Sequence, residues 1–450
     1  MPSNVLDSVL FRDSFGTPAM RAVFDDRELI RKYVEVEIAL AKAEAKCGVI
    51  PQEAADEIAA TCDADTLDFD LLRHETEIVG YPILPLVHQI SKQAGKSGGY
   101  VHWGATTQDI MDTAVALQIR DGLEIVENDI NELRKILADL STRYRDTPMA
   151  GRTHLQQALP VTFGYKTAIW LDIFDRHLER LQQLKPRVLV GEFAGAAGTL
   201  ASLGDKGLDV QKVMMEVLGL GAPVSTWHVA RDGFAEAINF LGFVTGSLGK
   251  IAYDVMLMAS NEFGELYEPF VKGRGASSTM PQKRNPISSE LMLACAKGVR
   301  QQAGLMLDAM VQDLERATGP WHAEWIAIPE SFVLAAGSLN QAKFMLSGLI
   351  VDEKAMARNL DMTKGLIVAE AVMMGLAPYI GRQDAHDVVY DACRVVNEQG
   401  GRLADVLNGM PSISSRLAPE IIEQLTDPKN YLGMAPQMVD QVLANSAKLG

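Results

Sequence analysis

Apolar residues recur at helical spacing along most of this chain and divide it into a series of helices. Residues 27–47 show the pattern, with Leu29, Tyr33 and Val36 three or four positions apart and a typical helix end at Gly48. The same spacing predicts five longer helices in the middle of the chain. They cover about residues 110–145, 155–185, 231–266, 287–314 and 330–350.

The segment 231–266 is apolar on nearly every face. Within it, residues 237–249 are almost uninterrupted apolar or small, but Lys250 and Asp254 follow in the same helical pattern. The uncharged stretch is too short to cross a bilayer, so we interpret it as a core helix. A helix buried on every side needs neighbours on every side, which favours an oligomer whose subunits share a core.

The last third of the chain has a different pattern. Between residues 354 and 450 the predicted helices are shorter, with breaks at Gly365, Gly381 and Pro411. The sequence contains no internal repeat, no low-complexity tract and no Gly-x-Gly-x-x-Gly nucleotide loop. These features predict a mainly helical protein and give no sign of a cofactor.

Composition and charge narrow the class of protein. With 450 residues, 48% of them hydrophobic, the chain can bury a large core and form two or three domains. A net charge of −16 argues against nucleic acid or an anionic membrane as a partner. An anionic substrate would therefore need a local basic pocket.

Cysteine and histidine spacing argues against a disulfide framework or a metal site. The four cysteines form no Cys-x-x-Cys pair, and no two histidines have the spacing of metal ligands. Residues 1–12 lack the basic and apolar regions of a signal peptide. We expect a cytoplasmic protein without a bound metal. The cysteines are Cys47, Cys62, Cys295 and Cys393.

The segment Gly-Ala-Ser-Ser-Thr-Met-Pro-Gln-Lys-Arg-Asn-Pro at residues 275–286 carries the strongest chemical signal. Gly273 and Gly275 give the backbone freedom, while Pro281 and Pro286 prevent a continuous helix. Two hydroxyls, a lysine and an amide in a mobile loop suit the handling of a carboxylate beside a reacting carbon. The alternative is an ordinary glycine-rich surface loop.

The loop resembles the signature segment of the fumarase/aspartase superfamily, with Ala276 as a small departure. Two further segments resemble the shared blocks of that superfamily and occur in the expected order. They are Gly-Ala-Thr-Thr-Gln-Asp at 104–109 and Gly-Arg-Thr-His-Leu-Gln at 151–156. Looser resemblance extends over nearly the whole chain.

This resemblance implies an all-α fold of three mainly helical domains with a central five-helix bundle. We expect domain boundaries at 1–108, 109–353 and 354–450. It also implies a homotetramer with a core of twenty helices, in which each active site is assembled from three subunits. The substrate would be a small polycarboxylate.

Ser277 stands at the position of the superfamily's catalytic base. A free serine hydroxyl is a very weak base, so its alkoxide would need positive potential from Lys283, loop amides or the helix after Pro286. Lys283 and Asn285 match the carboxylate-binding pair, and Ser278 could donate to the same group. Met280 is a further residue of the loop that we expect to contact the substrate. The alternative for Ser277 is a turn serine.

His154 matches a superfamily histidine, and Glu290 matches the carboxylate that orients it. Such a pair could move a proton at the leaving group. The alternative is a histidine that caps a helix beginning near residue 155. Further residues match substrate-binding positions or stand close to them. They are Thr106, Thr107, Gln108, Thr153, His228, Arg316, and the arginines Arg21 and Arg231. Thr106, Thr107 and Gln108 could instead form an N-cap cluster.

The sequence favours one side of the superfamily. The phosphate-binding Arg-Tyr pair of adenylosuccinate lyases is replaced here by Phe15-Gly16, so a nucleotide substrate is not expected. Residues 81–87 and the Trp-His pairs at 227–228 and 321–322 resemble the 3-carboxy-cis,cis-muconate cycloisomerase branch. Bacterial members of that branch tend to carry tryptophan where His154 stands.

His154 therefore favours a lyase that splits an N-substituted aspartate, such as an iminodisuccinate-like compound, into fumarate and an amine. The cycloisomerase is the alternative. A more distant alternative is an inactive structural member of the fold, which the presence of Ser277, Lys283 and Glu290 disfavours.

Overall fold

The computed structural model describes residues 4–316 and 318–449 and is predominantly helical. The all-α prediction is confirmed. The chain divides into two compact units: residues 1–131, 177–249 and 291–341 form unit 1, and residues 132–176, 250–290 and 342–450 form unit 2. The proposed division into three domains stays a prediction.

Five long helices form the middle of the chain, as the periodicity predicts, and each contributes residues to both units. They are α7 (Thr107–Arg143), α8 (Phe163–Val188), α10 (Asp232–Met258), α11 (Ile287–Ala309) and α12 (Pro320–Ser347). Four of the predicted bounds are wrong. The helix α11 ends at Ala309 and not near residue 314. The helix α8 starts later than residue 155, α10 ends before residue 266, and α12 begins at Pro320 and continues through Pro329.

Within unit 1 the segments of these five helices contact one another in a closed ring. Gly122 on α7 allows the closest approach, because a Cβ there would lie 2.8 Å from the Phe332 ring of α12. The other neighbours follow in the order α7, α8, α10, α11, α12. Their contacts are Glu127 with Lys185, His177 with Phe240, Gly242 with Ala303, and Gly298 with Leu334.

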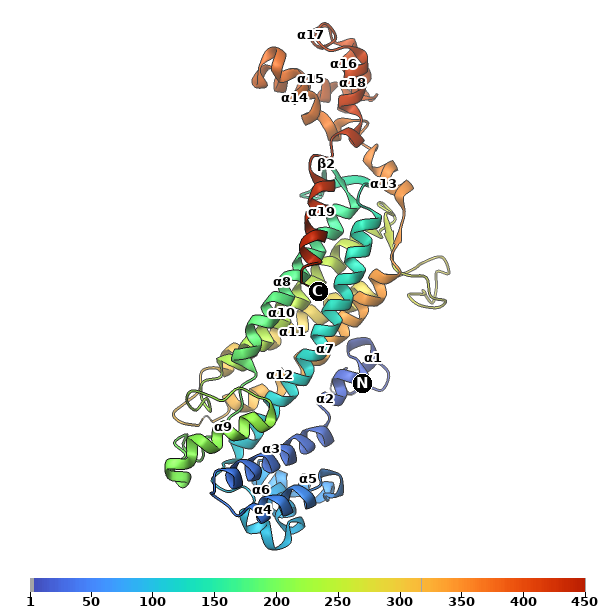
Figure 1. Cartoon of the computed structure of the whole chain (residues 1–450). Helices are drawn as coiled ribbons and strands as arrows, with labels where there is room; N and C mark the ends of the chain where they lie inside the picture. Colours follow the sequence, from blue (N-terminus) through green and yellow to red (C-terminus); the bar gives the residue numbers. More distant parts are fainter. Residues whose placement is uncertain (1–3, 317, 450) are drawn as a thin grey trace. The chain divides into compact units, whose positions relative to one another are not determined.

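Several shorter helices of unit 1, among them α2, α4 and α9, pack against the helix predicted at 27–47, which is observed as α3 (Asp26–Lys46). Figure 1 shows α3 to α6 lying together, in blue. The short helices of this unit are α1 (Arg12–Phe15), α2 (Pro18–Val23), α4 (Gln52–Thr61), α5 (Phe69–Val79), α6 (Ile83–Gln93) and α9 (Gly207–Leu218). Three 3-10 turns accompany them, at Ala64–Thr66, Gly95–Tyr100 and Ala201–Lys206.

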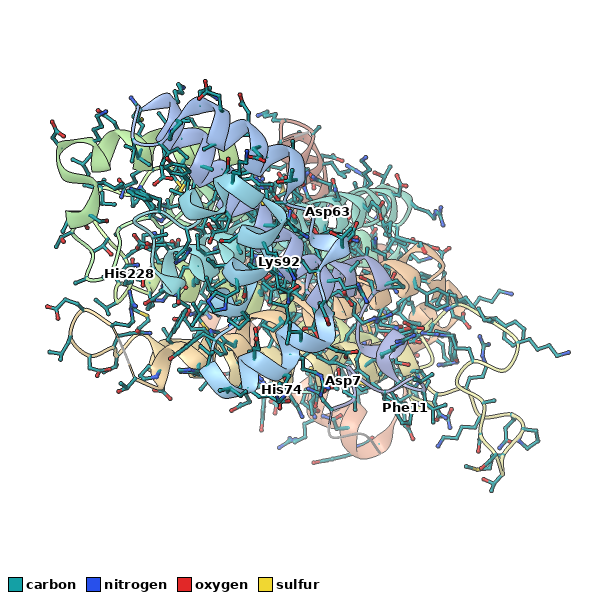
Figure 2. The ribbon with its side chains drawn as sticks, turned by 90° about the horizontal axis from the view of Figure 1, so that it is seen from below. Asp7, Phe11, Asp63, His74, Lys92 and His228 are labelled. Carbon is teal, nitrogen blue, oxygen red and sulfur yellow. The ribbon has the colours of Figure 1, made fainter. Side chains whose placement is uncertain are left out.

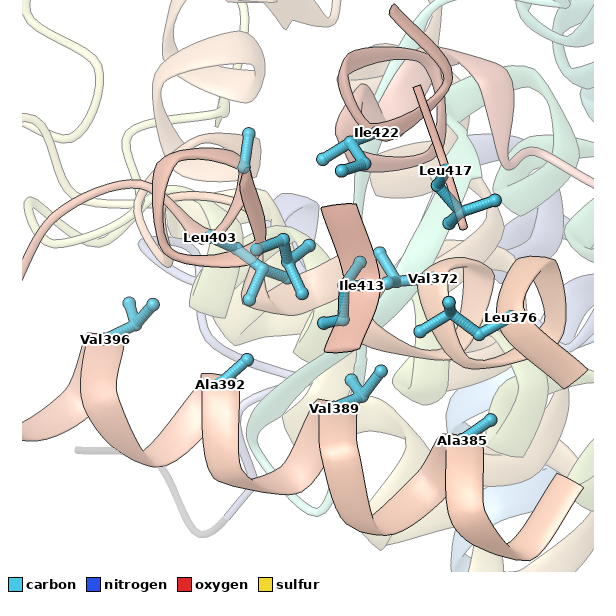
Figure 3. Packing of buried hydrophobic residues seen from close by; sticks show 12 residues of the cluster. Val372, Leu376, Ala385, Val389, Ala392, Val396, Leu403, Ile413, Leu417 and Ile422 are labelled. Atoms are coloured by element: carbon cyan, nitrogen blue, oxygen red, sulfur yellow. The ribbon is translucent and has the colours of Figure 1, made fainter. Parts of the chain in front are cut away.

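A separate hydrophobic cluster holds the C-terminal helices of unit 2 together. Figure 3 shows Ala385, Val389, Ala392 and Val396 along one side of α15 (Arg382–Gln399), facing residues of the neighbouring helices. Those helices are α14 (Ala369–Ile380), α16 (Leu403–Gly409), α17 (Pro411–Ser414) and α18 (Pro419–Thr426). The unit also contains α13 (Glu353–Leu360), α19 (Ala435–Ser446) and 3-10 turns at Leu366–Val368 and Pro428–Asn430.

Unit 2 contains two small antiparallel sheets that the periodicity does not predict. The strands β1 (Pro148–Thr153) and β2 (Gln156–Thr162) form a hairpin where a helix was expected from residue 155. Pro160 and the β-branched Val161 and Thr162 disfavour a helix start in this stretch. The second sheet pairs β3 (Leu266–Tyr267) with β4 (Ile350–Val351).

Among the described residues, α10 is the one helix long and apolar enough to cross a membrane by length and composition. Half of its apolar window is already buried within the chain. Core helices pass the same test, so this is weak evidence for a membrane span.

Candidate active site

The predicted signature loop lies in unit 2 and is closed at its base by its own backbone. The Asn285 amide donates to the Gly275 carbonyl over 2.9 Å, and Ala276 pairs with Arg284 in an isolated bridge. Gly275 has a φ of 69°, and a Cβ there would lie 2.4 Å from the Asn285 carbonyl oxygen. Only glycine suits this position, so the closed loop follows directly from the sequence.

Ser277 sits inside this loop and accepts two backbone hydrogen bonds. The amides of Met280 and Thr279 donate to Ser277 Oγ over 3.1 and 3.3 Å. These donors would stabilise an alkoxide at Oγ, which is the form that a serine base requires. Ser278, Met280 and Lys283 are exposed on the same loop, and Asn285 is half-buried at its base.

The amino end of α11 does not supply the potential that the sequence suggested. The carboxylate of half-buried Glu268 accepts from the Ser288 amide at 3.0 Å and from the Ser289 amide at 2.8 Å. It therefore satisfies these two helix-terminal donors and offsets the helix dipole. Arg274 donates to Ser288 Oγ and lies over the Phe344 ring, which fixes the other end of the loop. Sequence reasoning missed Glu268, because it lies outside the motif.

His154 lies at the tip of the β1–β2 hairpin. His154 and Leu155 both have positive φ, 52° and 63°, and connect the two strands as a two-residue turn. Arg152, at the end of β1, makes a two-pronged ion pair with buried Glu265 over 2.9 and 2.7 Å. The helix-cap alternative for His154 is therefore wrong, since no helix begins there.

Thr153 and His154 are exposed at this tip. Glu290, in the first turn of α11, is also exposed. Among the described residues, no hydrogen bond or ion pair joins His154 to Glu290 within one chain. The orienting role of Glu290 stays a prediction.

The other group of candidates lies in unit 1, around the start of α7. Thr106 precedes the helix, and its amide donates to Asp109 over 2.9 Å, the reciprocal half of a capping box. Arg316 donates to the Thr106 hydroxyl over 3.0 Å and to the Ala196 carbonyl over 3.1 Å. The structure thus brings Arg316 to Thr106, and Thr107 is the first residue of α7.

Gln108 and His228 are also brought together here, but both are buried. Gln108 donates to the His228 carbonyl over 2.9 Å and to Asp112 over 3.0 Å. His228 is 1% exposed, and its Nε2 lies 2.8 Å from Asp109. Figure 2 labels His228 near a loop, and also His74 on α5, which is exposed and belongs to no candidate group.

Asp109, Glu192 and His228 form a buried cluster whose potential ligand atoms lie within 4.8 Å of one another. Asp109 already accepts from the amides of Thr106, Ala194 and Gly195 and is paired with His228. A carboxylate has about four lone-pair sites, so none is left for a metal ion. Burial raises the pKa of Glu192 to about 7, which favours a polar network that holds protons rather than a metal centre.

Arg231 does not fit a substrate-binding role. It is fully buried and makes two-pronged ion pairs with Asp112 and Glu324, with N–O distances of 2.6 to 2.9 Å. A further contact reaches the Trp227 carbonyl at 3.4 Å. All five guanidinium donors are therefore used inside the protein. Arg21 pairs with Asp13 and the Arg12 carbonyl, apart from the other candidates.

Comparison with known proteins identifies the family. A profile described as lyase matches residues 13–300, and one described as adenylosuccinate lyase C-terminus matches residues 365–442. The chain belongs to the lyase family of the fumarase/aspartase superfamily. The resemblance to this superfamily that the three sequence blocks indicated is confirmed.

Several well-covered relatives of this lyase-family protein have different activities in their names. Trans-aconitate decarboxylase 1 of Mycosarcoma maydis is 47% identical over 96% of this chain and 88% of its own. 3-carboxy-cis,cis-muconate cycloisomerase of Pseudomonas aeruginosa is 44% identical over 100% of this chain and 98% of its own. N-acetyl-S-(2-succino)cysteine lyase of Dickeya dadantii is 39% identical over 98% of each chain.

A solved structure has the same fold. The fumarate lyase from Mesorhizobium sp. BNC1 aligns with a TM-score of 0.91 and 55% identity, covering 96% of this chain and 98% of its own. These comparisons establish a superfamily lyase and leave its substrate open.

Proposed function

We propose that this protein catalyses a reversible β-elimination from an N-substituted aspartate of the iminodisuccinate type. The products are fumarate and an amine. Ser277 removes the proton from the carbon next to the carboxylate, and the resulting aci-carboxylate is held by Lys283 and Asn285. Ser278, together with Thr106 and Thr107 of another subunit, is proposed to make the remaining polar contacts, while Gln108 positions the buried His228.

The geometry of Ser277 carries this proposal. Its Oγ accepts from two loop amides, and Lys283 lies on the same closed loop. A base of this kind needs its charged form stabilised before it meets the substrate. The loop supplies backbone hydrogen-bond donors and two cationic side chains, Lys283 and Arg284, of which Arg284 lies over the Phe270 ring.

His154 is proposed to protonate the leaving nitrogen. It is exposed at the tip of a rigid hairpin, where its imidazole is available to a substrate or to another subunit. Two similarities support the release of fumarate: a solved fumarate lyase and a relative named for a succino-substituted cysteine. We further propose a cytoplasmic homotetramer in which Glu290 approaches His154 from a different subunit.

The second candidate is 3-carboxy-cis,cis-muconate cycloisomerase. A specific observation favours it, since two segments that resemble that branch meet in unit 1. Tyr81 stacks on Trp321 with ring centroids 5.7 Å apart, and His322 lies 4.5 Å from Trp325. The cycloisomerase relative also matches this chain over its whole length.

A substrate panel tests the two candidates. Fumarate formation is followed by ultraviolet absorbance with N-substituted aspartates and with N-acetyl-S-(2-succino)cysteine. Loss of 3-carboxy-cis,cis-muconate and decarboxylation of trans-aconitate are measured alongside. We expect the highest kcat/KM with an N-substituted aspartate.

The variant His154→Trp sharpens this test, because indole cannot exchange a proton at neutral pH. It should abolish C–N cleavage. Efficient lactonisation of carboxymuconate that survives His154→Trp would show that the cycloisomerase is the correct function.

A further inference from the structure

A cavity of about 270 Å³ lies within unit 1, between α3, α7, α10 and α12. Its walls are aromatic, with Tyr33, Phe234 and Trp321 buried and Trp325 37% exposed at the edge. Trp321 and Trp325 meet edge to face, with ring centroids 5.3 Å apart. A concave space with largely aromatic walls and a few polar groups is typical of a small-molecule site.

The ionisable side chains that line the cavity include three carboxylates. Asp26, Asp112 and Glu324 line it, and none of its lining residues is a lysine, arginine or histidine. Arg231 lies behind Asp112 and Glu324 and neutralises one of these two carboxylates. Asp26 lies in the first turn of α3, is exposed, and makes no ion pair with any described residue. The cavity thus keeps an excess of negative charge.

A buried polar group also faces this space without a partner. Tyr33 is 1% exposed and lines the cavity, and no described residue forms a hydrogen bond with its hydroxyl. Burial, with the nearby charges of Asp112 and Asp26, raises the pKa of this phenol. The Tyr33 hydroxyl therefore stays neutral and can accept a hydrogen bond from a ligand.

We propose that this cavity binds a small organic ammonium ion, with its carbon skeleton against Trp321 and Trp325 and its charged group near Asp26 and Tyr33. The indole rings bury the carbon skeleton, and the unpaired carboxylate of Asp26 at the opening attracts the charged group. An anionic ligand would be repelled by the excess negative charge of the lining. The proposed ligand differs in charge from the polycarboxylate substrate, which needs cationic partners, and the cavity lies apart in sequence from the loop that holds Ser277 and Lys283.

Calorimetric titration of the full-length protein tests the proposal. The probe is phenethylammonium, compared with neutral 2-phenylethanol and anionic phenylacetate, which carry the same ring. We expect phenethylammonium to bind with a Kd below about 1 mM and at least about tenfold more tightly than the alcohol. Phenylacetate should not bind.

Two variants locate the ligand. Asp26→Asn should weaken phenethylammonium at least about fivefold without affecting the alcohol, and Trp325→Leu should weaken both. Asp70→Asn is the matched control, because Asp70 is exposed in the first turn of α5 and does not line the cavity. It should change neither affinity. Circular dichroism melting confirms that each variant is folded.

Three results would overturn the proposal. The first is no binding of phenethylammonium, and the second is equal binding of cation and alcohol. The third is an unchanged cation affinity in folded Asp26→Asn and Trp325→Leu. Because binding is measured directly, a failure here leaves the lyase proposal intact.

Discussion

At the scale of single residues, Ser277 has two roles in its loop. Its hydroxyl closes a local turn by accepting from Thr279 and Met280, and the same donors suit a serine alkoxide. Ser277→Ala should lower kcat about a thousandfold or more with a modest change in KM, because substrate binding by Lys283 and Asn285 remains.

Steady-state kinetics with the best substrate of the panel measures this effect. Ser415→Ala is the control, since it removes an exposed hydroxyl outside the candidate site and should keep full activity. A Ser277→Ala enzyme with more than about a tenth of wild-type turnover would exclude Ser277 as the base.

Glu44 gives a prediction about stability and pH. It is fully buried on α3, and its carboxylate oxygens have no hydrogen-bond partner among the described residues. Burial, and then the charge of Glu37, raises the pKa of Glu44 to about 9. Because the folded pKa lies above the unfolded value, Glu44 destabilises the fold progressively as pH rises from about 4.5 towards 9.

Glu44→Gln should remove this dependence, since the amide stays neutral. The melting temperature of the variant should exceed that of wild type by several degrees at pH 9, with a smaller difference at pH 6. Glu53→Gln, at an exposed position on α4, should show no such trend. If the difference in melting temperature between Glu44→Gln and wild type were the same at pH 6 and pH 9, the raised pKa of Glu44 would be contradicted.

At the scale of elements, the β1–β2 hairpin stores backbone strain beside the candidate His154. Leu155 is 74% exposed, so packing does not explain its left-handed φ of 63°. Leu155→Val should lower the free energy of unfolding by about 1 kcal/mol, because a β-branched residue adopts this conformation poorly.

Leu155→Gly should be neutral or slightly stabilising, since relief of strain is offset by greater freedom of the unfolded chain. Urea denaturation of the two variants measures the difference. Surface substitutions are normally close to neutral, so equal stability of Val and Gly at this position would show that the turn is not strained.

At the scale of the whole molecule, the candidate site residues are divided between the two units. Ser277 lies in the loop of unit 2, and Thr106 lies at the start of α7 in unit 1. The helix α10 leaves Phe243 59% and Tyr253 55% exposed in the single chain. These exposed aromatic residues support the proposal that further subunits cover this helix.

Subunit mixing tests composite sites. Inactive Ser277→Ala and His154→Ala proteins are dissociated, combined in equal amounts and reassembled. If Ser277 and His154 of one site come from different subunits of a tetramer, roughly a quarter of the activity should return. Native mass spectrometry must show the hybrids. Hybrids without activity would mean that each chain supplies both residues of its own site.

The sequence by itself determined the features that depend on neighbours a few residues apart. Apolar spacing predicted the five long helices, because one face of a helix is built from positions three and four apart. The closed loop at Gly275 and Asn285 is also local, and its motif led to the correct family.

The tertiary structure decided what depends on distant partners. The sequence assigned Arg231 to a substrate, but Asp112 and Glu324, which are 119 and 93 positions away, use its donors inside the protein. It predicted a helix from residue 155, where pairing with β1 instead forms a hairpin. Charge, hydrogen-bonding capacity and strand pairing are satisfied by whatever group lies close in space, and a one-dimensional pattern does not record that distance.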